Sequence, residues 1–264
     1  MKKEQLKDID LFLFDMDGTL YLGNQLYSFT KELLKTIRDG GKKYLFTTNN
    51  SSKSPEDYVK KLANLGIEST VEDFYTSSQA TAHYLLENHP GKKLYVCGTE
   101  SLKTQLRSAG FVVTEVLEEV ECVVMGFDTE LSFKKLEDAC ILLGRDIDYI
   151  ATNPDWVCPT WYGFVPDCGS VSEMLYTATK RRPTFIGKPQ PAMVELALDK
   201  TGYKKEEAVV IGDRLYTDIA CGVNAGISSI FVLSGEGTME DLEKSEVKPE
   251  FVYDNIRAIY EDLQ

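Results

Sequence analysis

The sequence lacks the features expected of an integral membrane protein or an exported one. No apolar run approaches the roughly 18 residues needed to cross a bilayer, so we expect no membrane partner. Residues 4–10 are polar, and the apolar run at residues 11–14 is too short for the core of an export signal. We therefore expect a cytoplasmic protein.

Paired cysteine motifs are also missing. The six cysteines form no CxxC pair and have no neighbouring histidines at zinc-ligand spacing. We interpret them as free thiols, which suits a reducing compartment. Because a buried free cysteine behaves as a small apolar side chain, we expect most of them to be packing residues.

Positive charge is scarce. The chain carries 29 lysines and arginines against 42 aspartates and glutamates, which gives a formal charge of −13. DNA and RNA normally bind to a basic face, so we expect no nucleic-acid polymer as a partner. A small phosphorylated molecule is compatible with this charge, because one lysine, a few backbone N–H groups and a metal ion can neutralise it locally.

Strand and helix patterns alternate along the chain of 264 residues, which is long enough for a large core and an inserted unit. Short apolar runs typical of buried parallel strands lie at residues 11–14, 44–46, 208–211 and 230–233. Helical patterns lie between them, at residues 30–38 and from Ser54-Pro55 onward. This alternation predicts an α/β fold whose ligand site lies beyond the carboxyl ends of the strands.

The middle of the chain repeats the pattern. Strands are expected at residues 94–96, 123–124 and 149–151, and helices near 102–109 and 132–143. A second α/β unit is therefore predicted as an insert. Residues 152–169 hold three prolines, both tryptophans and few periodic positions, which is more typical of a functional loop than of a linker.

The first expected strand ends in two carboxylates, Asp15 and Asp17, within the sequence DMDGT. Carboxylates this close repel each other unless a proton or a cation lies between them, and magnesium is the natural oxygen-preferring candidate. A surface turn with capping acids would explain Asp17 and the glycine after it, but not the strand that leads into them. The pattern indicates a metal-dependent site.

A second acidic site follows the strand expected at residues 208–211, where Asp213 comes directly after a glycine. If both strands are central in one parallel sheet, Asp213 can complete an oxygen shell with Asp15 and the backbone carbonyl of Asp17. Asp218 lies five residues further on. It is either an acid favoured by a helix N-terminus or a support for the metal shell.

Two further segments are ambiguous when taken alone. Thr48, Asn49 and Asn50 follow the strand expected at residues 44–46 and suit a phosphate group, but such residues are also common in turns. Lys188 stands in the sequence GKP, and an isolated lysine is usually a surface charge. Their order along the chain changes this interpretation.

In that order, the DMDGT motif, Thr48-Asn49, Lys188 and Gly212-Asp213 resemble the four motifs of haloacid dehalogenase-like (HAD) hydrolases over the whole chain. The sequences TNNS at 48–51, TNPD at 152–155 and GDRLYTD at 212–218 are similar to the NagD-type subfamily, which includes p-nitrophenyl phosphatases. The resemblance implies a Rossmann-like parallel-sheet core at residues 1–79 and 181–264, with a smaller α/β cap of type II inserted at 80–180.

The resemblance also implies a chemistry, namely magnesium-dependent hydrolysis of small phosphate monoesters through an aspartyl phosphate on Asp15. The second acid, Asp17, favours phosphoryl transfer over attack on a carbon–halogen bond. For catalysis, the resemblance implies Asp15, Asp17, Thr48 and Lys188. For the metal, it implies Asp15, Asp17 and Asp213, with Asp218 supporting these ligands from behind. For substrate binding, it implies Thr48, Asn49, Asn50, Asp155, Cys158 and Lys188.

Alternatives stay open at this point. A phosphotransferase would use the same residues with an acceptor other than water, and a non-enzymatic scaffold would be expected to have lost an acid or the lysine. Near the substrate, Trp156 and Trp161 can form walls or simply anchor their loop, and Cys158 can be inert. The expected partner is a small phosphorylated metabolite, such as a nucleotide or a sugar phosphate. Related proteins often dimerise through the cap, which allows a homodimer.

Overall fold

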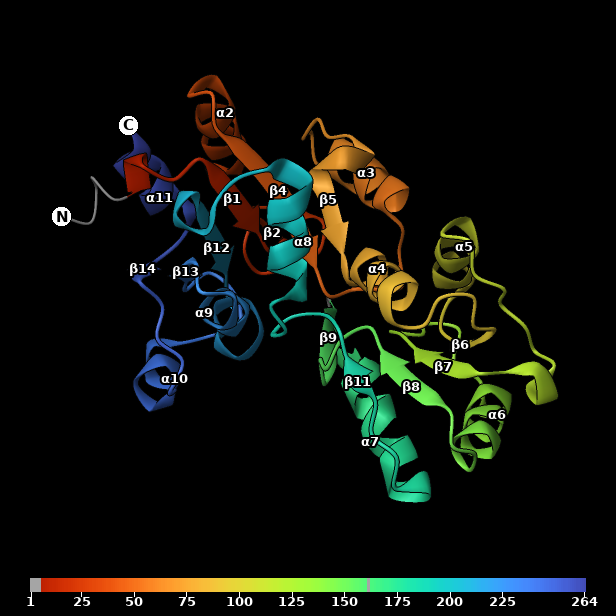
Figure 1. The fold of residues 1–264 in the computed structure, drawn as a ribbon. Coiled ribbons are helices and arrows are strands. Elements are labelled where there is room, and N and C mark those ends of the chain that lie inside the picture. The colour runs from red at the N-terminus through yellow and green to blue at the C-terminus, as the bar shows by residue number, and fades with distance from the viewer. Residues whose placement is uncertain (1–5, 161) are drawn as a thin grey trace. The chain divides into compact units, whose positions relative to one another are not determined.

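The computed structural model describes residues 6–160 and 162–264, which form two compact units (Figure 1). The first unit contains residues 6–48, 59–75 and 188–264. The second contains residues 49–58 and 76–187, apart from position 161. The domain boundaries predicted from the sequence, 1–79 and 181–264 against 80–180, stay a prediction.

A six-stranded sheet forms the centre of the first unit. Its strand order is β14-β13-β12-β1-β4-β5, and β1 lies parallel to both β12 and β4. All four residues of β1 are buried, as expected for a central parallel strand covered on both faces. The strands are β1 (Leu11–Phe14), β4 (Lys43–Thr48), β5 (Phe74–Thr76), β12 (Ala208–Gly212), β13 (Ser228–Val232) and β14 (Phe251–Tyr253).

The register of this sheet determines where its polar residues emerge. Phe14, the last residue of β1, is aligned with Ile211 of β12 and with Phe46 of β4. The segments that follow β1, β12 and β4 therefore leave the sheet at one edge. A short antiparallel hairpin, β2 (Tyr21–Leu22) and β3 (Gln25–Leu26), comes soon after β1.

Helices cover the sheet of the first unit. Leu11 and Leu13 pack with Val194 of α8 and Cys221 of α9, so these two helices cover one face (Figure 1). A turn of π-helix, Leu215–Ile219, leads directly into α9. The helices are α2 (Thr30–Asp39), α8 (Ala192–Thr201), α9 (Ala220–Ala225), α10 (Met239–Lys244) and α11 (Ile256–Leu263), with α3 (Pro55–Asn64) spanning the change from one unit to the other.

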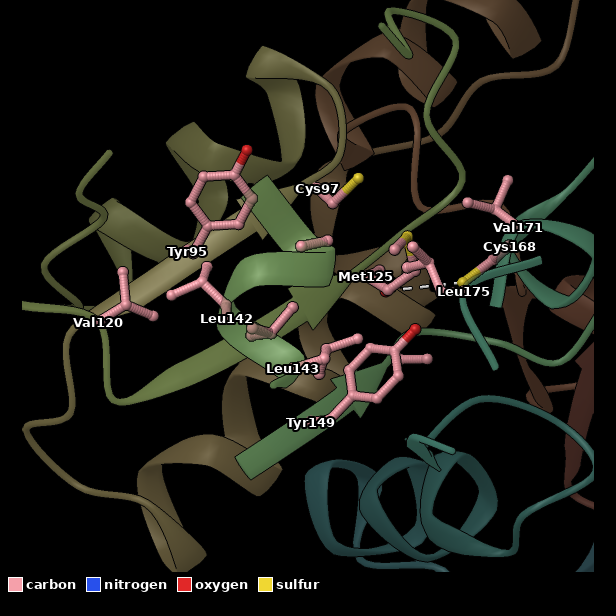
Figure 2. Packing of buried hydrophobic residues seen from close by; sticks show 13 residues of the cluster. Tyr95, Cys97, Val120, Met125, Leu142, Leu143, Tyr149, Cys168, Val171 and Leu175 are labelled. Carbon is pink, nitrogen blue, oxygen red and sulfur yellow. Dashed lines mark hydrogen bonds between the residues drawn. The ribbon is translucent and has the colours of Figure 1, made fainter. Parts of the chain in front are cut away.

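The second unit has its own parallel sheet of four strands, in the order β11-β8-β7-β6. On one face, side chains such as Tyr95, Met125 and Tyr149 pack against Leu142 of α6 and Val171 of α7 (Figure 2). The elements are β6 (Leu94–Cys97), β7 (Cys122–Met125), β8 (Asp148–Ala151), β11 (Thr184–Phe185), α4 (Ser77–Asn88), α5 (Glu100–Ser108), α6 (Phe133–Leu143) and α7 (Cys168–Thr179). The predicted fold class, a parallel-sheet α/β core with a smaller inserted α/β unit, is confirmed.

The expectation of an irregular loop over residues 152–169 is wrong in its middle part. Residues Val157–Thr160 (β9) and Gly163–Pro166 (β10) form an antiparallel hairpin, in which Pro159 faces Phe164. β-Branched and aromatic residues favour strands, and a two-stranded ribbon tolerates proline because each strand has an unpaired outer edge. The prolines therefore did not prevent strand formation.

The six cysteines are free thiols, as predicted, and four of them are buried. Cys97 and Cys168 belong to the apolar core of the second unit, where the Cys168 thiol donates to the carbonyl of Met125 (Figure 2). Burial raises the pKa of the Cys97 and Cys122 thiols to about 12. Among the helices of the described residues, none is long and apolar enough to span a bilayer.

Candidate active site

Three carboxylates converge at the carboxyl edge of the six-stranded sheet. Asp15 follows β1, and its N–H donates to the carbonyl of Ile211 at 2.8 Å, which continues the strand pairing toward the site. Asp213 follows the adjacent strand β12, and Asp218 lies in the π-helical turn after it. Oxygen atoms of Asp15, Asp213 and Asp218 all lie within 4.8 Å of one another. The register of two neighbouring strands therefore brings together acids that are distant in sequence.

Glycines leave room for the Asp213 carboxylate. Gly18 has a φ of +91°, and a Cβ atom at this position would lie 2.4 Å from Oδ2 of Asp213. A Cβ atom on Gly235 would lie 2.0 Å from the same oxygen. Thr19 donates its hydroxyl to Oδ1 of Asp213 at 3.2 Å. Two backbone segments therefore pack directly against this carboxylate, which only glycine permits.

Lys188 supplies the positive charge at this edge. Its ammonium group donates to Oδ1 of Asp15 at 2.7 Å, to Oδ1 of Asp218 at 2.6 Å and to the carbonyl of Thr47 at 3.4 Å. The residue is only 3% exposed, and a buried ammonium group is costly unless it is paired. Burial lowers the pKa of Lys188, but Asp15 and Asp218 outweigh burial and hold that pKa above its usual range. Lys188 therefore stays charged.

The electrostatics of the cluster fit a divalent cation. Burial raises the pKa of Asp15 well above its usual value despite the Lys188 ammonium, with Asp218 and Asp213 adding to the increase. Burial, with the Asp218 charge second, raises the pKa of Asp213 to about 6. Three carboxylates beside one ammonium group leave two formal negative charges. Carboxylate oxygens are the ligands that Mg²⁺ prefers, so the donor set fits this ion.

Asp17 has a separate environment. Its carboxylate forms an ion pair with Lys61 at 3.4 Å, and the Lys61 ammonium lies 4.0 Å from the centre of the Tyr21 ring. Lys61 comes from α3 and was not singled out from the sequence, where it is one lysine among many on an amphipathic helix. The side chain of Asp17 is thus held in place by a contact outside the three-carboxylate cluster.

The remaining predicted residues are divided between the two units: Thr48 belongs to the first, and the second contains Asn49, Asn50, Asp155 and Cys158. Thr48 is the last residue of β4 and follows Thr47, whose carbonyl accepts from Lys188. In the second unit, Asn49 donates its amide to Oδ1 of Asp155 at 3.2 Å, and both side chains are buried.

Asn50 and Cys158 also belong to the second unit. The side-chain oxygen of Asn50 accepts from the backbone N–H of Ser52 at 3.0 Å. Cys158 is half-buried in β9, and Trp156 beside this strand is exposed. Trp161 lies outside the described residues.

Family models match two segments of the chain, and known proteins match nearly all of it. A haloacid dehalogenase-like hydrolase model matches residues 12–112, and a HAD-hydrolase-like model matches residues 185–259. An acid sugar phosphatase of Staphylococcus aureus is 34% identical over 98% of this chain and 100% of its own length.

Solved structures agree with this match. A 4-nitrophenylphosphatase from Thermotoga maritima has a TM-score of 0.94 and 42% identity, covering 98% of this chain and 99% of its own. A glycerol phosphate phosphatase from Mycobacterium tuberculosis, solved in complex with calcium, has a TM-score of 0.91 and 31% identity, covering 98% of this chain and 76% of its own. The chain therefore belongs to the haloacid dehalogenase-like hydrolases, in the NagD-type subfamily predicted from its motifs, and it is a phosphatase.

Proposed function

We propose that this phosphatase hydrolyses phosphate monoesters of small molecules with Mg²⁺, through an aspartyl phosphate formed on Asp15. The observation that carries the proposal is the buried cluster in which Lys188 lies 2.7 Å from Asp15 and 2.6 Å from Asp218, with Asp213 beside them. A carboxylate at the end of a central strand, next to one buried ammonium group, suits covalent phosphoryl transfer.

Asp15 is the nucleophile in this proposal. Lys188 holds Oδ1 of Asp15, which limits rotation of the carboxylate while an oxygen attacks phosphorus in line. The new Asp15–phosphorus bond forms as the bond from phosphorus to the leaving oxygen breaks. Water then attacks phosphorus, which releases inorganic phosphate and regenerates the Asp15 carboxylate. Two smaller barriers replace one large one.

Asp17 moves the protons. It protonates the leaving alkoxide in the first step and takes a proton from the attacking water in the second. The contact with Lys61 at 3.4 Å supports this role, because it restricts the position of the carboxylate. Thr48 and Lys188 bind the oxygens of the phosphoryl group that do not leave.

Asp15, Asp213 and the backbone carbonyl of Asp17 would hold Mg²⁺. Asp218 would act behind them, because its two oxygens already accept from Lys188 at 2.6 Å and from the backbone N–H of Arg214 at 3.1 Å. The ion, when bound, would reduce the repulsion between the Asp15 carboxylate and the anionic phosphate group. The raised pKa values of Asp15 and Asp213 support a cation at this place.

The substrate proposed is a small phosphorylated metabolite, and the acid sugar phosphatase relative favours a sugar phosphate. Asn49, Asn50, Asp155 and Cys158 are the proposed contacts to the substrate outside the phosphate group. The same proposal divides the chain into a core at residues 1–79 and 181–264 and a cap at residues 80–180. It also includes a cytoplasmic location and a homodimer.

One experiment tests the function. Purified protein is incubated with 4-nitrophenyl phosphate and with a panel of sugar phosphates, glycerol phosphates and nucleotides, in excess chelator or in excess Mg²⁺, and inorganic phosphate is measured. We expect release with Mg²⁺ and none in chelator, whereas full activity in chelator would contradict the metal site. An added acceptor alcohol that becomes phosphorylated in place of phosphate release would indicate a transferase.

A further inference from the structure

A loop between β13 and α10 connects the two acidic segments of the site. Ser234 donates its hydroxyl to the carbonyl of Gly18, in the loop after β1, at 3.0 Å. The backbone N–H of Glu236 donates to Oδ2 of Asp213 at 2.8 Å, and that of Gly237 donates to the carbonyl of Asp213 at 3.0 Å. The loop at residues 234–237 therefore ties the segment that holds Asp15 and Asp17 to Asp213.

The side chain of Glu236 anchors this loop. Its Oε2 lies 2.8 Å from Nε of Arg214, whose side chain is largely buried. Its Oε1 accepts from the hydroxyl of Tyr216 at 3.0 Å. The backbone N–H of Glu236 thus binds the Asp213 carboxylate. Its own carboxylate contacts the side chains of Arg214 and Tyr216, which follow Asp213 in the sequence.

The packing in this region leaves Asp213 little freedom to move independently of the loop. Asp213 is 2% exposed, and a Cβ atom on Gly235 would lie 2.0 Å from its Oδ2. Any displacement of the 234–237 loop therefore moves the Asp213 carboxylate or removes the N–H group that orients it. Partners of this kind behind metal ligands typically change metal affinity by about 10- to 100-fold when mutated.

We propose that Glu236 is a positioning residue for the divalent cation: its carboxylate, held by Arg214 and Tyr216, keeps the 234–237 loop against Asp213 and so increases the affinity of the site for Mg²⁺. This inference rests on the proposed function, because it requires the cation to bind at Asp213.

The test measures Mg²⁺ binding by titration calorimetry, together with thermal unfolding. Glu236→Ala removes both anchoring contacts, and Tyr216→Phe removes a single hydroxyl without changing charge. Glu240→Ala is the matched control, because Glu240 carries the same charge, is exposed on α10 and pairs with Lys244. We expect the Mg²⁺ dissociation constant to rise about tenfold in Glu236→Ala and about threefold in Tyr216→Phe, and to be unchanged in the control.

The outcomes separate the two proposals. If wild-type protein binds Mg²⁺ but both Glu236→Ala and Tyr216→Phe bind it within about 1.5-fold of wild type, the inference is wrong, even if the melting temperature falls. If wild-type protein binds no Mg²⁺, the metal site of the proposed function fails, and this inference fails with it. If Glu236→Ala does not fold, Tyr216→Phe decides, because Tyr216 is an exposed residue and loss of its hydroxyl leaves the core intact.

Discussion

The ammonium group of Lys188 lies 2.6 Å from Oδ1 of Asp218, and both side chains are buried. This ion pair joins residues 30 positions apart and lies next to Asp15. A buried charge that loses its partner is strongly destabilising, because it can neither reach water nor find another counter-charge. The pair is therefore a structural support of the acidic cluster, and in the proposed function Lys188 also binds the phosphoryl group.

Replacing Lys188 should reveal how much this ion pair contributes to stability. Lys188→Met should lower the free energy of unfolding of the metal-free protein by about 3–5 kcal/mol, because Asp15 and Asp218 then lack their counter-charge. Adding Asp218→Asn should recover part of the loss, since one uncompensated charge disappears. Urea unfolding of both single variants and the double variant measures the coupling, and strictly additive effects would contradict a direct pair.

The nucleophile can be tested without loss of folding. Asp15→Asn should reduce turnover by roughly 10³-fold or more, because an amide cannot form the proposed acyl phosphate. Metal-free Asp15→Asn should be at least as resistant to thermal unfolding as wild type, because burial raises the pKa of Asp15 and disfavours its charge. Retained activity within about tenfold of wild type would remove Asp15 from this role.

Buried thiols should make the protein sensitive to alkali. Burial raises the pKa of the Cys97, Cys122 and Cys221 thiols from 9.0 to about 12, so the folded state keeps protons that the unfolded chain loses. The free energy of unfolding should therefore fall as pH rises above about 9, with each thiol contributing up to about 1.4 kcal/mol per pH unit.

Cys97→Ala provides the check on this pH dependence. Removal of the buried thiol should lower stability below about pH 9, because Cys97 packs in the core of the second unit. The slope of unfolding free energy against pH between about 9 and 11 should nevertheless be shallower than in wild type, since one titrating thiol is gone. Parallel slopes in urea unfolding at several pH values would show that Cys97 does not contribute.

Substrate selection should respond to the β9–β10 hairpin. Cys158 is half-buried in β9, so Cys158→Arg introduces a long charged side chain on this ribbon. If Cys158 contacts the leaving group, as the resemblance implies, relative kcat/KM values among phosphorylated metabolites should change while 4-nitrophenyl phosphate is much less affected. Equal losses on all substrates would indicate a structural role, and unchanged values would place Cys158 away from the substrate.

Local sequence patterns predicted β1, β4, β12 and β13 of the first sheet and β6, β7 and β8 of the second, but not the short strands β5, β11 and β14. The apolar runs at residues 11–14 and 208–211 became β1 and β12, with Asp15 and Asp213 directly after them. These predictions succeeded because a continuous apolar run of strand length can be buried only between covering helices. The hairpin at β9 and β10 was missed because prolines mask the strand preference of their neighbours.

The sequence by itself determined which chemical groups are present and where each leaves its strand, because strand ends follow from local hydrophobicity and turn residues. Only the tertiary structure decided which groups meet. Lys188 lies between Asp15 and Asp218, Lys61 lies against Asp17, and Glu236 holds Asp213 by its backbone. Such contacts depend on strand order, register and loop packing, which bring together residues far apart in sequence and leave no local pattern in it.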